Sequence, residues 1–272
     1  MEAKLQRRVQ RYGWDKAAEY YEGFWRKQLE PAQSRLLEMV ELRPGERVLD
    51  VACGTGLVTF PAAQTVAPDG EAVGTDISSG MVEAARALAA ERRIGNVSFE
   101  RMDAEHHDLP DASFDAALCA LGLMYVPDPQ QALREQYRLL KPGGRAGAAV
   151  WGQRERCGWA EIFPIVDARV QSEVCPMFFQ LGTQEVLKYT MEAAGFADVA
   201  LERLSTTVRF ESADETLGAA FLGGPVALAY SRFDEQTREA VHAEYLASID
   251  AYRTGDGFDI PGEFVIAVGW KR

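Results

Sequence analysis

Residues suited to metal binding are scarce in this sequence. Among its 272 residues there are only four cysteines, Cys53, Cys119, Cys157 and Cys175, and three histidines, His106, His107 and His242. No two cysteines form a CxxC pair, and the histidines do not have the spacing of a metal cage. The sequence therefore predicts no metal site, and it predicts reduced cysteines of the kind found in cytoplasmic proteins.

Positive charge is also in short supply, since 29 lysines and arginines stand against 41 aspartates and glutamates, for a net charge of −12. Nucleic-acid binders usually carry a basic face, so we do not expect nucleic acid as a partner.

Long hydrophobic runs are also missing. The longest uncharged apolar runs, Ala116–Pro127 and Leu217–Tyr230, are shorter than the roughly 18 residues that span a bilayer. The charged N-terminus has no apolar segment of a signal peptide behind it. We expect a cytoplasmic protein without a membrane partner.

What the sequence does contain is an alternation of strand and helix patterns that suits one domain over residues 1–272. Residues 1–42 predict a helical cap, with an aromatic-faced helix over 12–29 and a second helix that starts at Pro31. Residues 43–151 predict a core with helices over 55–66, 78–93 and 130–140 and with strands at Arg47–Ala52, Glu71–Asp76, Asn96–Arg101, Phe114–Leu121 and Arg145–Trp151. Apolar strands separated by helices predict an α/β fold with a doubly wound parallel sheet.

Beyond Trp151 the pattern is looser. Residues 152–195 and 211–260 predict helical lid elements with apolar faces, and residues 198–209 and 263–270 predict two further strands. No linker divides the chain into independent domains, so we expect the lids to be elaborations of one sheet.

A glycine turn, Gly54-Thr55-Gly56, follows the first predicted strand. Such a turn brings backbone close to a ligand, and an acidic residue, Asp76, ends the second strand about 20 positions later. These two features fit a dinucleotide, which makes a nicotinamide-dependent oxidoreductase one alternative. Thr59, however, replaces the third glycine, which would permit close helix approach around a dinucleotide.

Three aspartates favour a different ligand. Asp50, Asp76 and Asp103 lie at the ends of successive predicted strands. A carboxylate at Asp50 is a poor neighbour for a pyrophosphate but a good one for ammonium and sulfonium charges. Asp76 suits ribose hydroxyls, and Asp103 suits the exocyclic amine of adenine. The three together predict S-adenosylmethionine as the cofactor.

These residues resemble the class I S-adenosylmethionine-dependent methyltransferases over about 12–151, in the small-molecule group related to ubiquinone and menaquinone C-methyltransferases. VLDVACGTG is similar to the family's first motif, GTDISSGMVEAA to its second, and the stretch from NVSF to LKPGG to the region from its third strand to its fifth. The resemblance implies a Rossmann-like seven-stranded sheet of order 3-2-1-4-5-7-6 whose last strand, 263–270, is antiparallel. It also implies cofactor contacts from Tyr20 or Tyr21, Ala52, Gly54, Gly56, Asp76, Ile77, Met81, Asp103, Ala104, Ala120 and Leu121.

Methyl transfer from a sulfonium requires mainly that the acceptor is held in line with the departing sulfur. A base is needed only if the acceptor must lose a proton, and the candidates are His106, His107, Tyr125 and one of Tyr20 and Tyr21. Met124-Tyr125 replaces the Arg-Asn of the quinone enzymes, which argues against a quinone acceptor. We expect methylation at O, C or N of a small, apolar or aromatic acceptor by a monomer or homodimer. A non-catalytic relative that binds the cofactor is a third alternative.

Overall fold

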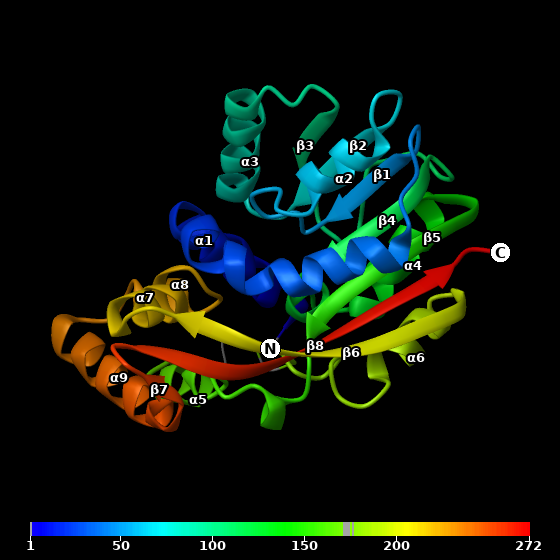
Figure 1. Ribbon diagram of the computed structural model, residues 1–272. Coiled ribbons are helices and arrows are strands. Elements are labelled where there is room, and N and C mark those ends of the chain that lie inside the picture. Colours follow the sequence, from blue (N-terminus) through cyan, green and yellow to red (C-terminus); the bar gives the residue numbers. More distant parts are fainter. Residues whose placement is uncertain (1, 171–174, 176) are drawn as a thin grey trace.

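A single mixed sheet organises the chain, whose computed structural model describes residues 2–170, 175 and 177–272 (Figure 1). The strands lie in the order β3-β2-β1-β4-β5-β8-β6, and a short β7 pairs with β8 outside this path. Their bounds are β1 Arg47–Val51, β2 Glu71–Asp76, β3 Val97–Arg101, β4 Phe114–Ala120, β5 Leu140–Trp151, β6 Ala197–Phe210, β7 Arg253–Thr254 and β8 Gly257–Trp270. The predicted strand order and the antiparallel last strand are therefore confirmed, with β7 as an addition.

Apolar side chains explain why the central strands form. Val48, Leu49 and Val51 of β1 are fully buried, and Leu49 is paired in register with Val73 of β2 and with Ala117 of β4. Strands buried on both faces need helices on both sides. In Figure 1 the later part of α1 crosses in front of the sheet, whereas α4 and α6 lie behind it.

Nine α-helices are assigned in the described part of the chain. Their bounds are α1 Ala3–Val40, α2 Thr59–Val66, α3 Ser79–Arg92, α4 Pro129–Leu139, α5 Ile162–Asp167, α6 Val186–Ala193, α7 Ala213–Leu217, α8 Ala227–Tyr230 and α9 Glu235–Ser248. Either Ser78 or Ser79 could cap the helix predicted over 78–93, and the structure shows Ser78 as the cap, because its hydroxyl accepts a hydrogen bond from Met81 N at 3.1 Å. None of the described helices is both long and apolar enough to cross a membrane.

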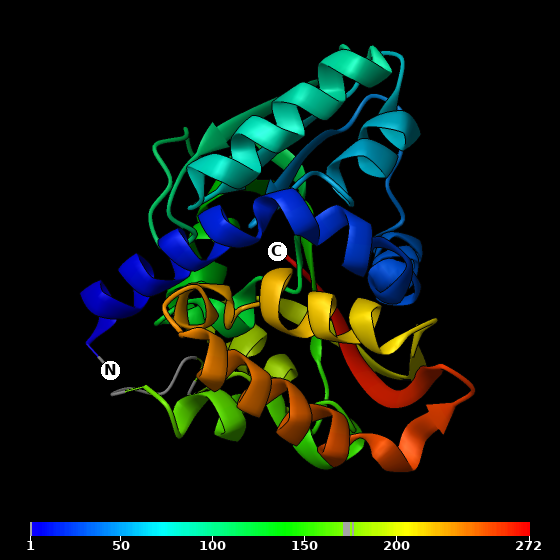
Figure 2. The same ribbon diagram turned by 90° about the vertical axis from the view of Figure 1, so that its left-hand side faces the viewer.

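The N-terminal cap differs from the prediction, because α1 is one helix of 38 residues with Pro31 inside it. A proline in a helix interior removes one backbone hydrogen bond and favours a bend, but it need not end the helix when the flanking residues are packed. Leu29, Ala32 and Leu36 around the proline are all buried. Figure 2 shows the resulting path: the first part of α1 runs across the view, and its last part is seen nearly end-on.

The prediction that 211–260 is helical is wrong at its end, because β7 and the start of β8 occupy 253–254 and 257–260. Phe258 and Ile260 are buried while Asp259 and Pro261 are more exposed, which is the two-residue alternation of a strand. Two other boundaries also moved. The helix after the glycine turn begins at Thr59 and not at 55. β5 begins at Leu140 and not at Arg145, with an irregularity in its pairing to β4 between Phe114 and Ala116.

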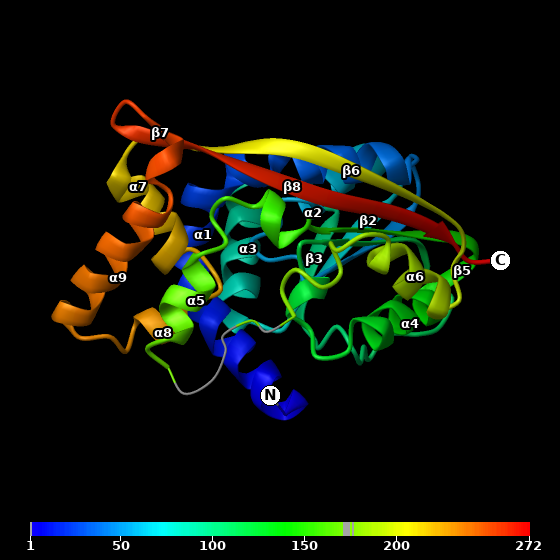
Figure 3. The same ribbon diagram turned by 90° about the horizontal axis from the view of Figure 1, so that it is seen from below.

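The long strands β6 and β8 continue past the rest of the sheet and carry the helices α5, α7, α8 and α9 beside their far end (Figure 3). Helix α1 lies between this group and α3, and it contacts both α3 and α8 (Figure 2). The fold therefore places one long helix across the carboxyl ends of β1 and β4, with α3 on one side of it and the group of α5, α7, α8 and α9, the predicted lid, on the other.

Candidate active site

A cavity lies at the carboxyl ends of β1 and β4, where the direction of the strand order reverses. Ligands of doubly wound folds bind at this point. The structure brings most of the predicted site residues to the lining of this cavity, namely Tyr21, Ala52, Gly54, Asp76, Ile77, Met81, Asp103, Ala104, Ala120, Leu121 and Tyr125. The remaining predicted residues, Tyr20, Asp50, Gly56, His106 and His107, are outside the lining.

The turn after β1 brings bare backbone to the cavity. Ala52 and Leu121, which line it from the ends of β1 and β4, have φ values of 55° and 64°, and Gly54 has a φ of 55°. Positive φ in residues other than glycine is uncommon and occurs often at binding sites. The two strand ends also approach closely, since a Cβ placed on Gly122 would collide with the Cβ of Ala52. The turn therefore leaves backbone groups, with little side chain, facing the ligand.

Asp76 is held in place from both sides. Its Oδ2 accepts a hydrogen bond from Gly54 N at 2.9 Å, and its Oδ1 accepts one from Ser78 N at 2.8 Å. Each carboxylate oxygen has a second lone pair, so the side chain can still accept from two ligand hydroxyls. Burial raises the pKa of Asp76 to about 6, against the opposing effect of these two hydrogen bonds.

Asp50 lies behind the turn and not on the cavity surface. It is 1% exposed, and its Oδ2 accepts a hydrogen bond from the Thr59 hydroxyl at 2.6 Å. The threonine at the third glycine position is therefore the partner of this buried carboxyl. Burial, and then the neighbouring Asp76, raise the pKa of Asp50 to about 7.

The two buried carboxyls make this end of the cavity suitable for a cation. Neither Asp50 nor Asp76 forms an ion pair with any described residue, and no cation is among the causes of their pKa shifts. A ligand with a diol and positive charges would pair with Asp76 directly and would stabilise both carboxylates through a low-dielectric medium. These residues fit S-adenosylmethionine, with Asp76 at the ribose and the Asp50 charge acting from behind the turn.

Helix α1 closes this part of the cavity. Oδ1 of Asp15 accepts hydrogen bonds from the Ser78 hydroxyl at 2.7 Å and from Gly80 N at 3.0 Å, so α1 is attached to the start of α3. Trp14 on α1 forms edge-to-face ring contacts with Tyr21 on the same helix and with Tyr125, which follows β4. Its ring centroid lies 5.7 Å from that of Tyr21 and 5.1 Å from that of Tyr125. Of the two tyrosines considered at the sequence level, Tyr21 lines the cavity, and Tyr20 is 37% exposed.

The segment after β3 is also held by α1. Arg7 Nε lies 3.0 Å from Oδ2 of Asp103 and 2.7 Å from Oε2 of Glu105, and all three residues line the cavity. Asp103 Oδ1 accepts a hydrogen bond from Glu105 N at 3.0 Å. Asp103 thus lines the cavity, and it shares its charge with an arginine that the sequence did not single out.

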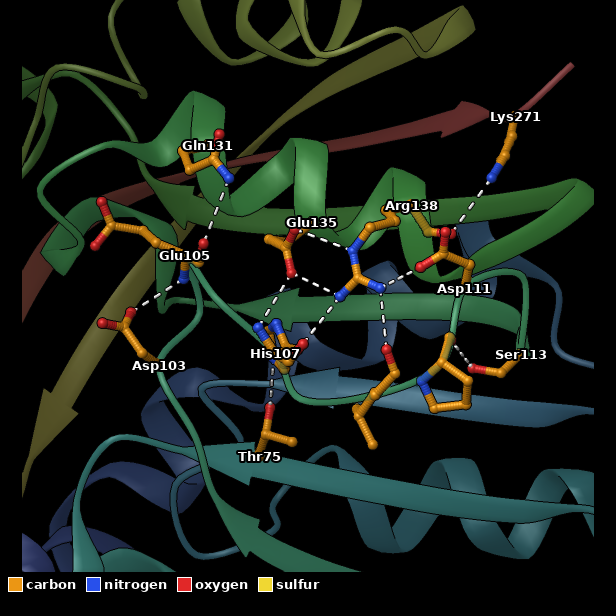
Figure 4. A network of polar contacts seen from close by, with 12 residues as sticks. Thr75, Asp103, Glu105, His107, Asp111, Ser113, Gln131, Glu135, Arg138 and Lys271 are labelled. Atoms are coloured by element: carbon orange, nitrogen blue, oxygen red, sulfur yellow. Dashed lines mark hydrogen bonds and ion pairs between the residues drawn. The ribbon is translucent and has the colours of Figure 1, made fainter.

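His107 belongs to a polar network behind this segment (Figure 4). Its Nε2 lies 3.2 Å from the Thr75 hydroxyl, its backbone N donates to Glu135 at 3.1 Å, and its backbone oxygen accepts from Arg138 at 2.9 Å. Burial lowers the pKa of His107 to about 4. The geometry makes His107 a residue that fixes the 103–107 segment to β2 and α4, and it does not place the imidazole, or that of His106, against an acceptor.

The other half of the cavity is aromatic. Seven aromatic side chains line this half, which we refer to as the acceptor chamber: Trp25, Trp151, Trp159, Phe163, Phe178, Phe210 and Tyr245. Trp151 contacts Trp159 at 4.8 Å between ring centroids and Trp25 at 6.4 Å. At the sequence level the aromatic residues at 159–179 and 221–233 could be either core or cavity lining. Trp159, Phe163 and Phe178 line the chamber, whereas Phe221, Tyr230 and Phe233 are outside the described lining. Trp25, Phe210 and Tyr245 were missed because nothing in their local pattern separates a cavity position from a core position.

Comparison with known proteins gives three findings. A model of a methyltransferase domain family matches residues 48–144. Nocamycin O-methyltransferase from Saccharothrix syringae is 31% identical over 260 residues, which is 89% of this chain and 91% of that protein. Demethylmenaquinone methyltransferase from Listeria monocytogenes is 34% identical over 139 residues, and this match covers 51% of the chain and 56% of the relative.

Solved structures share the fold. The YcgJ protein from Bacillus subtilis superimposes with a TM-score of 0.61 at 20% identity, over 89% of this chain and 99% of that one. Together with the nocamycin enzyme, which matches nearly the whole chain, this likeness extends well beyond the cofactor motifs to the lid elements.

Proposed function

This chain belongs to the class I S-adenosylmethionine-dependent methyltransferases, and we propose that it methylates an acidic hydroxyl on a small, apolar, ring-containing acceptor. The family, the enzyme class and the cofactor predicted from the sequence are thereby confirmed, and the oxidoreductase alternative is set aside. The bound cofactor supplies a methyl group on a sulfonium. The atom that receives it, and the molecule that carries this atom, are the subject of the proposal.

The acceptor chamber is the observation that carries the proposal. The charged residues of the described cavity lining are Arg7, Asp76, Asp103 and Glu105, and all of them lie at the cofactor end. The chamber itself presents tryptophan and phenylalanine rings, which favour flat, apolar molecules through area and ring-to-ring contacts. An ammonium or phosphate group would lose its hydration there without gaining a charged partner.

The lack of a free base in the acceptor chamber supports an acidic hydroxyl. Within the described lining there is no histidine or lysine. Its three carboxylates lie at the cofactor end, where Asp76 accepts two backbone hydrogen bonds and Asp103 and Glu105 pair with Arg7. Burial raises the pKa of Tyr125 and of Tyr21 well above the ordinary value, so neither phenol is a base near neutral pH. An acceptor hydroxyl that ionises unaided, such as an enol or an activated phenol, needs no protein base. The chain then has to orient the acceptor and exclude water, which the aromatic walls and α1 can do.

The name of the nocamycin O-methyltransferase supports methylation at oxygen and not at carbon or nitrogen. That relative matches nearly the full chain, whereas the demethylmenaquinone enzyme matches half of it. The replacement of the Arg-Asn pair of the quinone enzymes by Met124-Tyr125 points in the same direction.

The proposal is tested with a matched pair of acceptors. The protein is incubated with S-adenosylmethionine and either 4-hydroxycoumarin, an acidic enol, or 4-aminocoumarin, its amine counterpart, and products are identified by mass spectrometry. β-Naphthol is included as a less acidic hydroxyl. We expect O-methylation of the enol to be fastest and the amine to be unreactive. Preferential methylation of the amine or of a ring carbon would contradict the proposal.

Calorimetric titration with S-adenosylhomocysteine provides the control for the cofactor site. We expect saturable binding, and its absence at high micromolar concentration would remove the basis for any methyl transfer by this chain.

A further inference from the structure

One hydroxyl in the acceptor chamber has no partner. Tyr245 on α9 lines the cavity and is 3% exposed, and its ring packs edge-on against Phe221 at 5.8 Å. No described residue forms a hydrogen bond with its hydroxyl, and the hydroxyl is also not among the fully enclosed unpaired atoms, which include the indole nitrogens of Trp25 and Trp159. A hydroxyl that is neither bonded nor enclosed, on a residue this deeply buried, opens into the cavity.

Two other hydroxyls of this part of the chain, those of Thr216 and Tyr230, have partners. The Thr216 hydroxyl, also on the lining, donates to the Ser212 carbonyl at 2.8 Å, and the Tyr230 hydroxyl lies 2.9 Å from His242 Nε2. A buried hydroxyl without a partner costs free energy and requires an explanation. Water or a ligand atom in the chamber is the partner that this position allows.

Tyr245 also stands apart from the groups at the cofactor end. It comes from α9, which packs against α5, whereas the rings of Tyr21 and Tyr125 both contact Trp14 on α1. Its hydroxyl is therefore placed to meet a part of the acceptor other than the atom that is methylated. Burial raises the pKa of Tyr245 well above its ordinary value, so the hydroxyl keeps its proton at neutral pH and donates.

We propose that Tyr245 determines acceptor specificity by donating a hydrogen bond to an oxygen atom, such as a ring carbonyl, remote from the methylated hydroxyl. This rests on the proposed function and adds a second feature to the acceptor, a hydrogen-bond-accepting oxygen at its far end. Sites built to bind such an oxygen discriminate strongly against an analogue that lacks it, because the buried hydroxyl is then left unpaired.

The test uses two probes of the same shape, α-tetralone, which has one ring carbonyl, and tetralin, which has a methylene at that position. Their binding to protein saturated with S-adenosylhomocysteine is measured by calorimetry for the wild type, Y245F and Y230F. We expect the wild type to bind the ketone about tenfold more tightly than the hydrocarbon. Y245F should lose this preference with tetralin affinity unchanged, and Y230F, which alters a lid tyrosine outside the cavity lining, should keep it.

Equal affinity of the wild type for the two probes, binding of neither, or an undiminished preference in Y245F would overturn the inference. Because these measurements need no turnover, they are separable from the proposed function. Failure of enol methylation with an intact ketone preference would reject the O-methylation proposal alone.

Discussion

The two halves of the cavity are built in different ways. The cofactor half consists of short segments that follow consecutive strands, at Ala52–Gly54, Asp76–Met81 and Asp103–Ala104, and it presents carboxylates and backbone. The acceptor chamber is assembled from α1, the end of β5, Trp159, Phe163 and Phe178, β6 and α9, and it presents aromatic rings. A charge-bearing ligand can be recognised by residues next to one another in sequence, whereas a shape-selective apolar chamber requires side chains from the whole chain.

This difference leads us to expect that the two halves respond separately to substitution. The largest effect should come from Asp76→Ala, which removes the partner of Gly54 N and Ser78 N and the carboxylate that we expect to bind the ribose. Affinity for S-adenosylhomocysteine should fall by about a hundredfold or more, since hydrogen bonds to charged groups contribute roughly 1.5–3 kcal/mol each. Calorimetry measures this, with Asp256→Ala in the exposed β7–β8 turn as the matched control.

If the halves are separate, tetralin binding to the chamber should survive in the Asp76→Ala protein whenever circular dichroism shows it to be folded. Loss of tetralin binding in a folded variant would mean that the halves are coupled, and unchanged cofactor affinity would remove Asp76 from the site.

A smaller effect is expected from Asp15→Ala, which breaks the contact between α1 and α3 over the cofactor. Dissociation of S-adenosylhomocysteine should become about tenfold faster, because opening of α1 no longer breaks two hydrogen bonds to a carboxylate. Stopped-flow tryptophan fluorescence follows this rate. Glu19→Ala, an exposed position on the same helix, should leave the rate unchanged; equal rates for the wild type and Asp15→Ala would show that α1 does not limit release.

The smallest expected effect is on the pH dependence of stability, which should change on substitution in the cofactor half but not in the acceptor chamber. The pKa values of Asp50 and Asp76 are about 7 and about 6 in the folded protein, against 3.8 ordinarily. The folded state binds these protons more tightly than the unfolded state, so both groups lower stability as pH rises from about 4 to about 7. We expect the melting temperature of Asp50→Asn to fall less between pH 5 and pH 8 than that of the wild type. Y245F should follow the wild type, and an identical slope in Asp50→Asn would contradict the assignment.

The sequence predicted the elements whose determinants are local. The positions of β1 and β2 and the start of α3 at Ser78 follow from apolar runs, capping residues and glycine turns, and they hold in the structure. The strand order, which the family resemblance implied, holds as well. Placement of Asp50 could not be predicted in the same way. It adjoins the glycine turn in sequence, but strand alternation directs its side chain away from the cavity and towards Thr59.

The errors have long-range causes. Whether Pro31 ends a helix depends on the surfaces against which α1 packs, and the roles of Arg7 and Trp25 depend on partners far along the chain, Asp103 and Phe210 among them. Tyr245 is one of several aromatic residues with similar local patterns, and only the folded lid distinguishes its unpaired hydroxyl from that of Tyr230.

Helix α1 has a consequence for the kinetic order of the reaction. Tyr21 and Trp25, one turn apart on this helix, line the cofactor half and the acceptor chamber respectively. Any movement of α1 that opens the cofactor half would therefore also remove a wall of the chamber. We therefore expect a compulsory order in which S-adenosylmethionine adds first and S-adenosylhomocysteine leaves last. S-adenosylhomocysteine should then inhibit the enzyme competitively with respect to S-adenosylmethionine.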